Sequence, residues 1–490
     1  MAARFGLGVG AAWLGALLSG CAVGPDFVRP AAPTVDTFTG NAAETSQPLT
    51  AGPGEAEQQF AVGQRIAAQW WDLYQSDQLS AAVQRSIADS PTLAAAEATL
   101  AQAQEAVVQA RAAFYPQIDA AAGVSRQETA AAPLRGKSNS TFNIFSLGGS
   151  VSYSPDVFGG TRRQVEQAGA LAESQDYQLA AAYLALTGNV VSQVIAIAGA
   201  RLQIAASEEI VAEDEHNLEL VSAKFDAGKA ARTDVLTADS QLANDRALLP
   251  PLRQQLSAAN HALSILVGRL PAEWAPPDFE LAQLTLPVDL PVSLPSDLVH
   301  QRPDIMAAEA ELHGASAAIG VATAQLYPSI TLSGSAGLES LTPDTLFEGA
   351  SSLWNLAAGV TAPIFHGGAL LSQRRSAVDA FQGALAAYRQ TVLLAFGQVA
   401  DTLDALAHDA DLVAAQRHAL DVADESLALA RVSYAAGKSD VLQLLDSQRL
   451  NQQARLGYAR AETQRFQDTT QLFVALGGGW WEPRSMPPAA

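Results

Sequence analysis

Two five-residue segments decide the fold of this 490-residue chain: Phe225-Asp226-Ala227-Gly228-Lys229 and Tyr434-Ala435-Ala436-Gly437-Lys438. They share a pattern of an aromatic residue, then glycine and lysine, and they begin at positions 225 and 434, which are 209 residues apart. Each follows a long helix-favouring stretch and ends it at a glycine, the residue preferred just after a helix. The chain is therefore internally duplicated, and a duplication has to be recognised before any fold is assigned.

The repeat extends well beyond these segments. Tyr115-Pro116 recurs as Tyr327-Pro328, and Asp234-Val235-Leu236 recurs as Asp440-Val441-Leu442. Each copy contains, in order, a helix, two strands, a long helix and a returning helix. We therefore expect one body built from two halves rather than several unrelated domains.

Composition and repeat position divide the chain into six segments. These are a cleaved signal peptide (1–20), a lipidated N-terminal tether (21–64), a first repeat (65–270), a linker or equatorial region (271–302), a second repeat (303–479) and a C-terminal tail (480–490).

The N-terminus resembles the signal of a bacterial lipoprotein. Arg4 precedes an apolar run that ends in Leu18-Ser19-Gly20-Cys21, and these four residues match the lipobox. The match implies cleavage before Cys21 and lipidation of that residue; the alternative is an ordinary signal peptide that contains a cysteine. Ala22 follows in place of the aspartate associated with inner-membrane retention, so the outer membrane is the expected location.

Charge and residue usage exclude several function classes. The formal charge is −21, from 29 basic and 50 acidic residues, so a nucleic-acid partner is not expected. Cys21 is the only cysteine, which excludes a disulfide framework and a cysteine-based metal site. The seven histidines are dispersed and no catalytic constellation is present. We expect no enzyme activity, no metal and no cofactor.

Four segments show the alternation typical of membrane-spanning strands. They cover residues 118–124, 145–153, 330–338 and 354–364, at matching places in the two repeats. A tilted strand crosses a bilayer in about ten residues. Beyond the signal no run of eighteen apolar residues occurs, so a membrane span would have to be made of strands.

The long helices show a seven-residue apolar period. Reading back from Phe225 gives Leu218, Val211, Ile204, Ile197, Val190 and Tyr183, and reading back from Tyr434 gives Leu427, Leu420, Val413, Leu406, Val399, Val392, Leu385 and Val378. A strict seven-residue period indicates helices that wind left-handedly around neighbours. At about 1.5 Å per residue, such helices reach roughly 100 Å, which suits the wall of a tube.

Two further features concern assembly and the turns. An open sheet edge in lipid leaves backbone groups without partners, so four strands must close with other copies. Three copies give a twelve-stranded barrel, whereas two give eight strands and a filled interior. We therefore expect a homotrimer.

At the turns, Gly228 and Gly437 are expected to end the long helices, with Thr233-Asp234 and Ser439-Asp440 capping the returning ones.

Several motifs resemble one family over nearly the whole mature chain. They are Cys21-Ala-Val-Gly24-Pro25-Asp26-Phe27, Trp70-Trp71, Gln301-Arg302-Pro303-Asp304-Ile305, Tyr327-Pro328 and Pro363-Ile364-Phe365-His366-Gly367-Gly368. They look like the outer-membrane efflux proteins of the TolC/NodT type. One departure is Ser90-Pro91-Thr92-Leu93, at a helix start where the family usually has an Asn-x-Asp-Leu-like sequence, and another is Gln443, where some members carry an aspartate.

The resemblance implies an α+β membrane protein. In that fold, four transmembrane strands per chain form a trimeric twelve-stranded β-barrel, continuous with a twelve-helix periplasmic α-barrel that has an equatorial belt. The protein would be lipid-anchored in the outer membrane and would extend into the periplasm.

The implied function is that of the passive exit duct of a tripartite efflux pump for small molecules such as drugs or toxic compounds. The implied partners are a periplasmic adaptor, an inner-membrane transporter of the resistance-nodulation-division (RND) class and outer-membrane lipid. One alternative keeps the fold but exports polypeptides, as in type I secretion. Another is a coiled-coil periplasmic scaffold lipoprotein without a pore.

The resemblance also assigns candidate residues at the periplasmic tip. Asp446, nine residues after Gly437, matches an aspartate that rings the closed aperture in the family. Asp440 is a weaker aperture candidate and is also expected to cap a helix. Tyr434 is either part of a latch at the tip or the end of the apolar seam. Thr237 stands at the first-repeat equivalent of Asp446, so we expect the gate to come from the second repeat.

Overall fold

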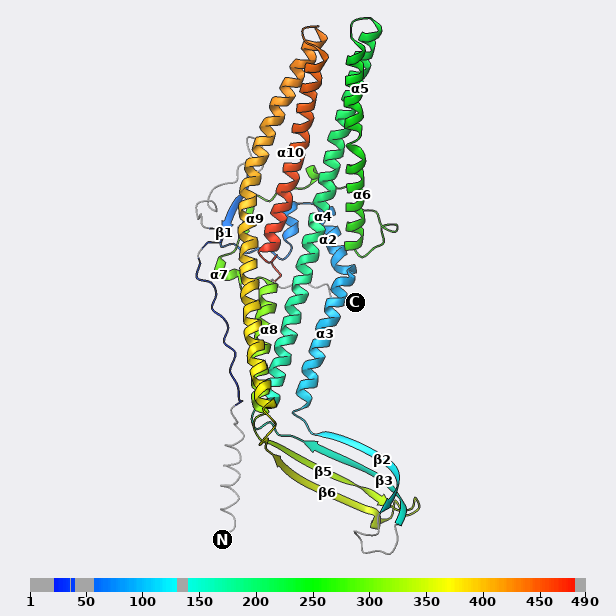
Figure 1. The fold of residues 1–490 in the computed structure, drawn as a ribbon, viewed down its shortest axis with the longest axis vertical. Helices are drawn as coiled ribbons and strands as arrows, with labels where there is room; N and C mark the ends of the chain where they lie inside the picture. The colour runs from blue at the N-terminus through cyan, green and yellow to red at the C-terminus, as the bar shows by residue number, and fades with distance from the viewer. Residues whose placement is uncertain (1–21, 36, 40–56, 130–139, 481–490) are drawn as a thin grey trace. The chain divides into compact units, whose positions relative to one another are not determined.

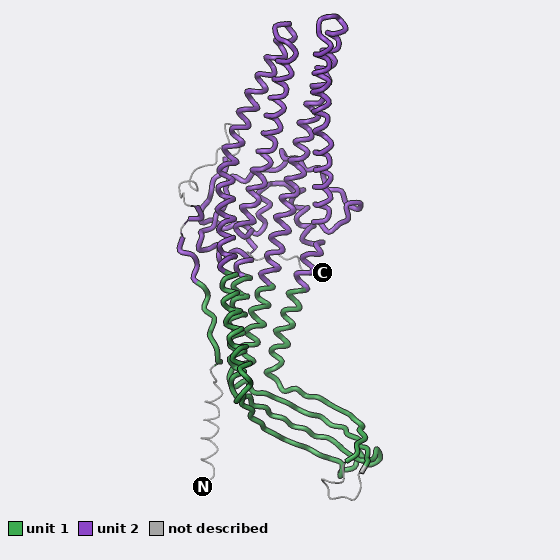
Figure 2. The backbone as a smooth tube through the Cα atoms, viewed as in Figure 1, with its two compact units in different colours: residues 1–30, 99–175, 307–388 green, residues 31–98, 176–306, 389–490 purple. Residues whose placement is uncertain are grey.

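The computed structural model describes residues 22–35, 37–39, 57–129 and 140–480. The chain forms two compact units, and each draws segments from both repeats (Figure 2). Unit 1 contains residues 1–30, 99–175 and 307–388, and unit 2 contains 31–98, 176–306 and 389–490.

Unit 1 holds a curved four-stranded sheet, which is antiparallel throughout (Figure 1). Its strands are β2 (Gln117–Thr129), β3 (Ser140–Tyr153), β5 (Ser329–Ser340) and β6 (Ser352–Thr361), and they lie in that order. Each repeat contributes one hairpin, and β3 pairs with β5 to join the two hairpins. The four expected strands are confirmed, although β6 ends at Thr361 and leaves Ile364 outside the sheet.

The N-terminal segment is fixed to unit 1 by backbone and ionic contacts. The backbone N–H of Val23 donates to Phe158 O at 3.0 Å, and Arg163 Nε donates to Val23 O at 3.2 Å. Arg163 is almost completely buried and forms an ion pair with Asp26 at 2.7 Å. Gly24 has a φ of +98° and packs directly on Gly320, where a Cβ would lie 2.4 Å from the Gly320 Cα. We call residues 22–29 the N-terminal strap.

Two further contacts extend the strap along its length. The Phe27 ring stacks on His313 with centroids 4.5 Å apart, and His313 Nε2 lies 3.0 Å from Glu166 Oε1. Arg29 forms an ion pair with Glu309 at 2.5 Å. The segment that follows Cys21 in the sequence is therefore an ordered part of unit 1 rather than a free tether.

Long helices account for most of the remaining structure (Figure 1). The bounds are α2 (Asp77–Asp89), α3 (Pro91–Ala112), α4 (Gly160–Asp226), α5 (Arg232–Arg246), α6 (Leu249–Leu266), α7 (Pro295–Leu298), α8 (Pro303–Ala324), α9 (Ala369–Ala435) and α10 (Val441–Ala475). The expected long and returning helices are present in both repeats. In unit 2, α10 runs antiparallel to α9.

The returning helix of the first repeat is not continuous. It is divided into α5 and α6 at Ala247-Leu248. Pro250 and Pro251 follow at once, and proline has no backbone N–H for the helical bond four residues back. The second repeat has no proline at this place, so α10 continues unbroken.

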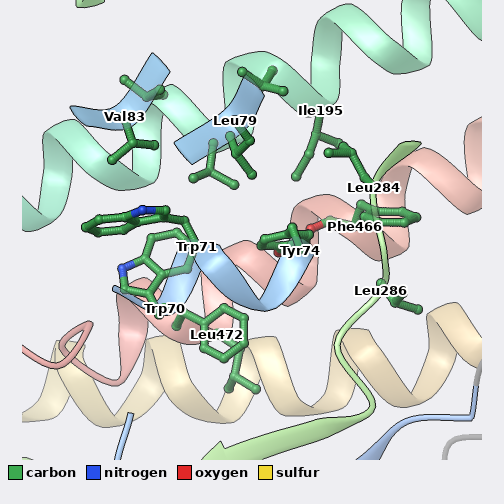
Figure 3. Packing of buried hydrophobic residues seen from close by; sticks show 14 of the residues in the cluster. Trp70, Trp71, Tyr74, Leu79, Val83, Ile195, Leu284, Leu286, Phe466 and Leu472 are labelled. Atoms are coloured by element: carbon green, nitrogen blue, oxygen red, sulfur yellow. The ribbon is translucent and has the colours of Figure 1, made fainter. Parts of the chain in front are cut away.

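The core of unit 2 is built around aromatic residues from the start of the first repeat (Figure 3). Trp70, Trp71 and Tyr74 lie in a 3₁₀ helix, η2 (Trp70–Tyr74), and are all less than 2% exposed. Residues 67–90 do not form one continuous helix, because Gln75 adopts a left-handed φ of +51° and Ser76 starts α2 as its N-cap. The break lets the two tryptophans face inward while α2 runs on separately.

The linker between the repeats contributes structure that the sequence did not predict. Strand β4 (Asp289–Val292) pairs in parallel with β1 (Gln59–Val62), a segment expected to be part of the extended tether. Arg302 is buried and donates to Ala475 O at 2.8 Å while it pairs with Asp304 at 2.7 Å. Trp480 Nε1 donates to Gln301 O at 2.6 Å. The Gln-Arg-Pro-Asp motif is thus a structural junction.

The predicted apolar seam is confirmed for α9 but is wrong for the tip half of α4. In α9, the predicted positions Val378, Leu385 and Leu420 are only partly buried, whereas the other six are buried, namely Val392, Val399, Leu406, Val413, Leu427 and Tyr434. In α4, Ile204, Val211 and Leu218 are only partly buried, and the buried positions are Ser207, Ile210, Asp214, Asn217 and Val221. These also recur with a period of seven, but the seam includes polar residues.

Within the described residues, α4 is the one helix that is long and apolar enough to cross a membrane by length and composition. Over half of its most apolar window is buried. Val190, Val194 and Ile197 from this stretch have no exposed surface and belong to the Trp70–Trp71 core. This burial indicates a core helix.

The strap contacts give a test at Gly24. Gly24→Ala should release the strap, because the methyl group would overlap Gly320 and the left-handed backbone alone costs on the order of 1 kcal/mol. We expect faster hydrogen exchange in residues 22–29. Gly63→Ala is the control, since Gly63 has a φ of +83° but nothing within 4 Å of its Cβ position. Equal protection of the strap in Gly24→Ala and the unaltered protein would contradict this packing.

Candidate functional site

The four-stranded sheet has two chemically different faces. Successive residues of a strand point to opposite faces, so the register sorts the side chains of all four strands. One cross-strand row contains Ile118, Val151, Gly334 and Leu356, and another contains Ala120, Gly149, Ala336 and Trp354. These two rows lie on the same face and are entirely apolar.

The intervening rows carry polar groups. One contains Asp119, Ser150, Ser335 and Asn355, and its neighbour begins with Gln117, Ser152 and Ser333. Strands of a transmembrane barrel alternate in this manner, with apolar side chains toward lipid and polar side chains toward the lumen. The arrangement therefore provides one surface for lipid and one for water.

The two tip turns have the same backbone geometry. In the first, Gly228 N donates to Phe225 O at 2.8 Å and Lys229 N to Lys224 O at 2.7 Å; Gly228 has a φ of +70°. In the second, Gly437 N donates to Tyr434 O at 3.1 Å and Lys438 N to Ser433 O at 2.9 Å; Gly437 has a φ of +69°. Both are Schellman motifs, which require a residue that tolerates positive φ. The expected glycine ends of the long helices are confirmed.

The capping aspartates act differently in the two turns. Asp440 is the N-cap of α10, and its Oδ1 accepts from Gln443 N at 2.9 Å. Asp234 does not cap α5 from the expected position, because Thr233 already lies inside the helix and Ala231 is the N-cap. The Asp234 carboxylate instead reaches back to accept from Ala231 N at 2.9 Å. Both carboxylates therefore satisfy backbone donors at helix starts.

Tyr434 lies at the contact between the two long helices. It is buried with Val221 and Leu444, and the Lys224 ammonium of α4 lies 3.4 Å from its ring centroid. Lys224 Nζ also donates to Tyr434 O at 3.4 Å. Burial, reinforced by the charge of Asp234, raises the pKa of Tyr434. Tyr434 therefore packs in the core at the end of the apolar seam and makes a cation–π contact between helices, and its latch role stays a prediction.

A groove of about 700 Å³ opens beside this contact. Glu213 of α4 and Arg431 of α9 line it and form an ion pair at 2.5 Å. The other lining residues include His216, Asn217, Lys224 and Leu444. It lies between the two helical hairpins of the tip and carries both signs of charge.

Asp446 is exposed on α10 and forms an ion pair with Arg449 at 2.7 Å. The side chains are 61% and 46% exposed, so the pair is free to exchange with water or another chain. Sequence reasoning missed Arg449, although its position three residues after Asp446 on a helix places it within reach. The aperture role of Asp446 stays a prediction.

A buried polar seam joins α4, α5 and α10 behind the tip. Asp245 of α5 accepts from Gln241 Nε2 at 2.7 Å and from Gln452 Nε2 of α10. Asp214 of α4 lies beside Asp245, and the protonated Asp214 carboxyl forms a hydrogen bond with it. Both polar atoms of the buried Gln448 side chain of α10 have no hydrogen-bond partner. Unpaired buried polar groups carry a desolvation cost, so this seam is weaker than an apolar one.

The Asp214 carboxyl is held in its neutral form. Burial raises its pKa to about 8, and the hydrogen bond and charge of Asp245 act in the same direction, as does the charge of Glu213. Burial likewise raises the pKa of Asp409 on α9 to about 7, with Asp468 of α10 as its neighbour. Neither pair was found from sequence, because the partners lie on separate helices.

Cys21 lies outside the described residues, although the strap that begins at Ala22 is ordered. Within the described ranges, no group of three or more histidine, aspartate or glutamate side chains is arranged to hold a metal ion.

The comparisons with known proteins agree with this geometry. The family model described as "outer membrane efflux protein" matches residues 82–269 and 294–478, one segment in each repeat. The pyoverdine export outer membrane protein OpmQ of Pseudomonas aeruginosa is 30% identical over 91% of this chain and 95% of its own length. The outer membrane protein OprJ of the same organism is 29% identical over 98% and 97% of the two chains.

The fold is likewise that of solved outer-membrane channels. The structure of the outer-membrane channel OprN superposes with a TM-score of 0.84 at 26% identity and covers 94% of this chain and all of its own. The expected fold class is thereby confirmed, and the family consists of ducts rather than enzymes. The chain belongs to the outer membrane efflux protein family and is an exit duct for efflux in the outer membrane.

Proposed function

We propose that this protein is the homotrimeric exit duct of an RND-type tripartite pump and conducts small molecules passively from the periplasm to the exterior. The observation that carries the proposal is the sheet with one apolar face, one polar face and two unpaired edges. Lipidation of Cys21 would anchor each copy in the outer membrane. The duct would have no energy source of its own, and the transporter would select the cargo.

The sheet edges support the trimer. Strands β2 and β6 are at the two edges of the sheet, so their outer backbone groups have no partner within it. In the hydrocarbon core each unsatisfied group costs several kcal/mol, so an open sheet is not viable there. Pairing β6 of one copy with β2 of the next closes twelve strands around a lumen wide enough for water.

The tip supports a gate and a docking surface. Three copies would bring three Asp446 carboxylates around one axis, where mutual repulsion and attraction of cations are expected. The groove beside Tyr434 is the surface we assign to the periplasmic adaptor. The groove contains an ion pair and side chains of both charge signs, so it suits a polar helical partner better than an apolar one.

Two alternatives remain distinguishable. A type I secretion duct would share the barrel, but family members with a lipobox usually serve small-molecule pumps. A scaffold without a pore would have no use for two wholly apolar rows on one face of the sheet, since such rows exposed to water favour aggregation. The sheet therefore favours a duct over a scaffold.

The duct can be tested by electrical recording. The purified full-length protein should run as a heat-labile trimer in detergent and give stepwise single-channel conductance in planar bilayers, because closed strands around a polar face leave an aqueous path. The matched control is protein that has been heated to the monomer before reconstitution. A protein that stays monomeric and gives no conductance steps would overturn the proposal.

The aperture assignment is tested by Asp446→Ala. Removing three carboxylates from one constriction should lower cation preference and change the conductance, because the local negative potential is lost. Asp421→Ala is the control, since Asp421 is an exposed α9 residue paired with Arg417 at 3.7 Å. If Asp446→Ala conducts with the same amplitude and ion preference as the unaltered trimer, Asp446 is not at the aperture.

The polar seam predicts a dependence of stability on pH. When the pKa of a carboxyl rises from 3.8 to about 8 on folding, the folded state loses stability as pH increases between these values. The reason is that the carboxyl ionises first in the unfolded chain. Asp214→Asn should therefore raise the trimer's dissociation temperature at pH 8 but barely change it at pH 4. Glu215→Gln, at a half-exposed neighbour, is the control. Asp409 contributes part of the slope, so the variant should reduce it rather than abolish it. An unchanged slope would contradict the assignment.

A further inference from the structure

The apolar face of the sheet is not smooth. It carries an open groove of about 390 Å³ that crosses all four strands. Gly149 and Ala336 contribute little or no side chain to it, whereas Ile118, Leu356 and Trp354 stand beside it. The volume lies within the range of roughly 300–1,000 Å³ that is usual for ligand sites.

The groove is open because of one residue in particular. A Cβ built on Gly149 would meet only Asp119 O, at 3.6 Å, which is an ordinary contact distance. At Gly334 the corresponding position is already covered, by Leu356 Cδ2 at 3.0 Å and Val151 Cγ1 at 3.2 Å. The free space therefore lies above Gly149, between Ile118 and Trp354.

The walls of the groove are side chains without packing partners of their own. Ile118, Leu356 and Trp354 are each at least 75% exposed. None of the lining residues is charged, and Ser150 and Ser335 belong to the rows whose side chains point to the other face. A ligand here has to be apolar along the whole length that the groove covers.

We propose that this groove binds one acyl chain of an outer-membrane phospholipid. The assignment rests on the proposed function in one respect, namely that the apolar face of the sheet points to lipid. The groove is continuous with that face, so bilayer chains are the material in contact with it. The groove holds one acyl chain in preference to the surrounding bilayer because of its shape. Apolar character gives no preference, because all the lipid chains are as apolar as the groove itself.

The position of the groove favours a phospholipid from the periplasmic leaflet. Ile118 is the second residue of β2, just after the turn from helix α3. The helices are the periplasmic part of the duct, so this end of the groove lies near the periplasmic surface of the membrane.

The trimer does not cover this site. Gly149 and Ala336 lie on β3 and β5, the two central strands, whereas neighbouring copies would pair along the edges of β2 and β6. A side chain on the outer face of a central strand stays exposed to lipid when a barrel closes. The groove is therefore available in the assembled duct.

The test uses the full-length protein in phosphatidylethanolamine vesicles that contain a trace of the same lipid with a diazirine in mid-chain. After photolysis, mass spectrometry should find label concentrated on peptides with Val151 and Leu356 rather than on Ile330 and Val360, which lie on the same face outside the groove. Gly149→Leu should lower the groove label roughly tenfold, because the added side chain fills the space.

Gly359→Leu is the matched control, because Gly359 is in the same sheet, outside the groove, and has nothing within 4 Å of its Cβ position. It should leave the groove label unchanged. Trp354→Ala, which removes one wall without adding bulk, should also weaken the label if Gly149→Leu impairs folding. Label spread evenly over the apolar face, or equal label in Gly149→Leu and the unaltered protein, would overturn the site.

The competing occupant is an acyl chain carried by Cys21 itself. Cys21→Ser removes that chain, so groove label that stays constant supports a bilayer phospholipid, and label that rises several-fold shows that the protein's own chain occupied the groove. Conductance of the same preparations separates this inference from the duct. Gly149→Leu should conduct normally. If a conducting preparation shows label spread evenly over the apolar face, the groove site is refuted while the duct is not.

Discussion

The structure depends on one constraint, which is that backbone hydrogen-bonding groups cannot be left unpaired in hydrocarbon. Four strands satisfy each other's inner edges through β2-β3-β5-β6 pairing, but they leave two edges open. A single chain therefore cannot complete a membrane-spanning unit by itself. Duplication supplies two hairpins per chain, and assembly supplies the closure that duplication cannot.

The duplication also explains which features the two repeats share and which they do not. Backbone devices are shared, as the two Schellman turns with φ values of +70° and +69° demonstrate. Side-chain chemistry has diverged, since Asp446 and its partner Arg449 occur only in the second repeat. The first repeat breaks its returning helix at Pro250, whereas α10 is continuous. Geometry common to both halves builds a regular wall, and their differences make one pair of helices distinct from the other.

Much of the fold could be predicted because it is local. The alternation of side chains predicts the strands. Gly228 and Gly437 predict the helix ends, because a glycine just after a helix is a local signal that needs no distant contact. The β1–β4 pair could not be predicted, because it joins residues about 230 positions apart within segments that read as linker. Asp214 and Asp245 were missed for the same reason, and the seam in α4 was misplaced because apolar residues next to the true seam also recur every seven positions.

The sheet and the tip differ in how they place polar groups. In the sheet, the rows of Ile118 and Ala120 are apolar and the row of Asp119 between them is polar, so in these rows each side chain lies on the face that suits it. Behind the tip, the buried Gln448 side chain has polar atoms without partners, and the Asp214–Asp245 carboxyl pair is removed from water. Water would hydrate these groups if α10 moved away from α4 and α5, which would lower the cost of such a movement. A seam made of leucine would resist the same separation, because it would expose apolar surface. Separation of the strands would therefore leave backbone groups unpaired, whereas separation of the helices behind the tip would hydrate buried polar groups.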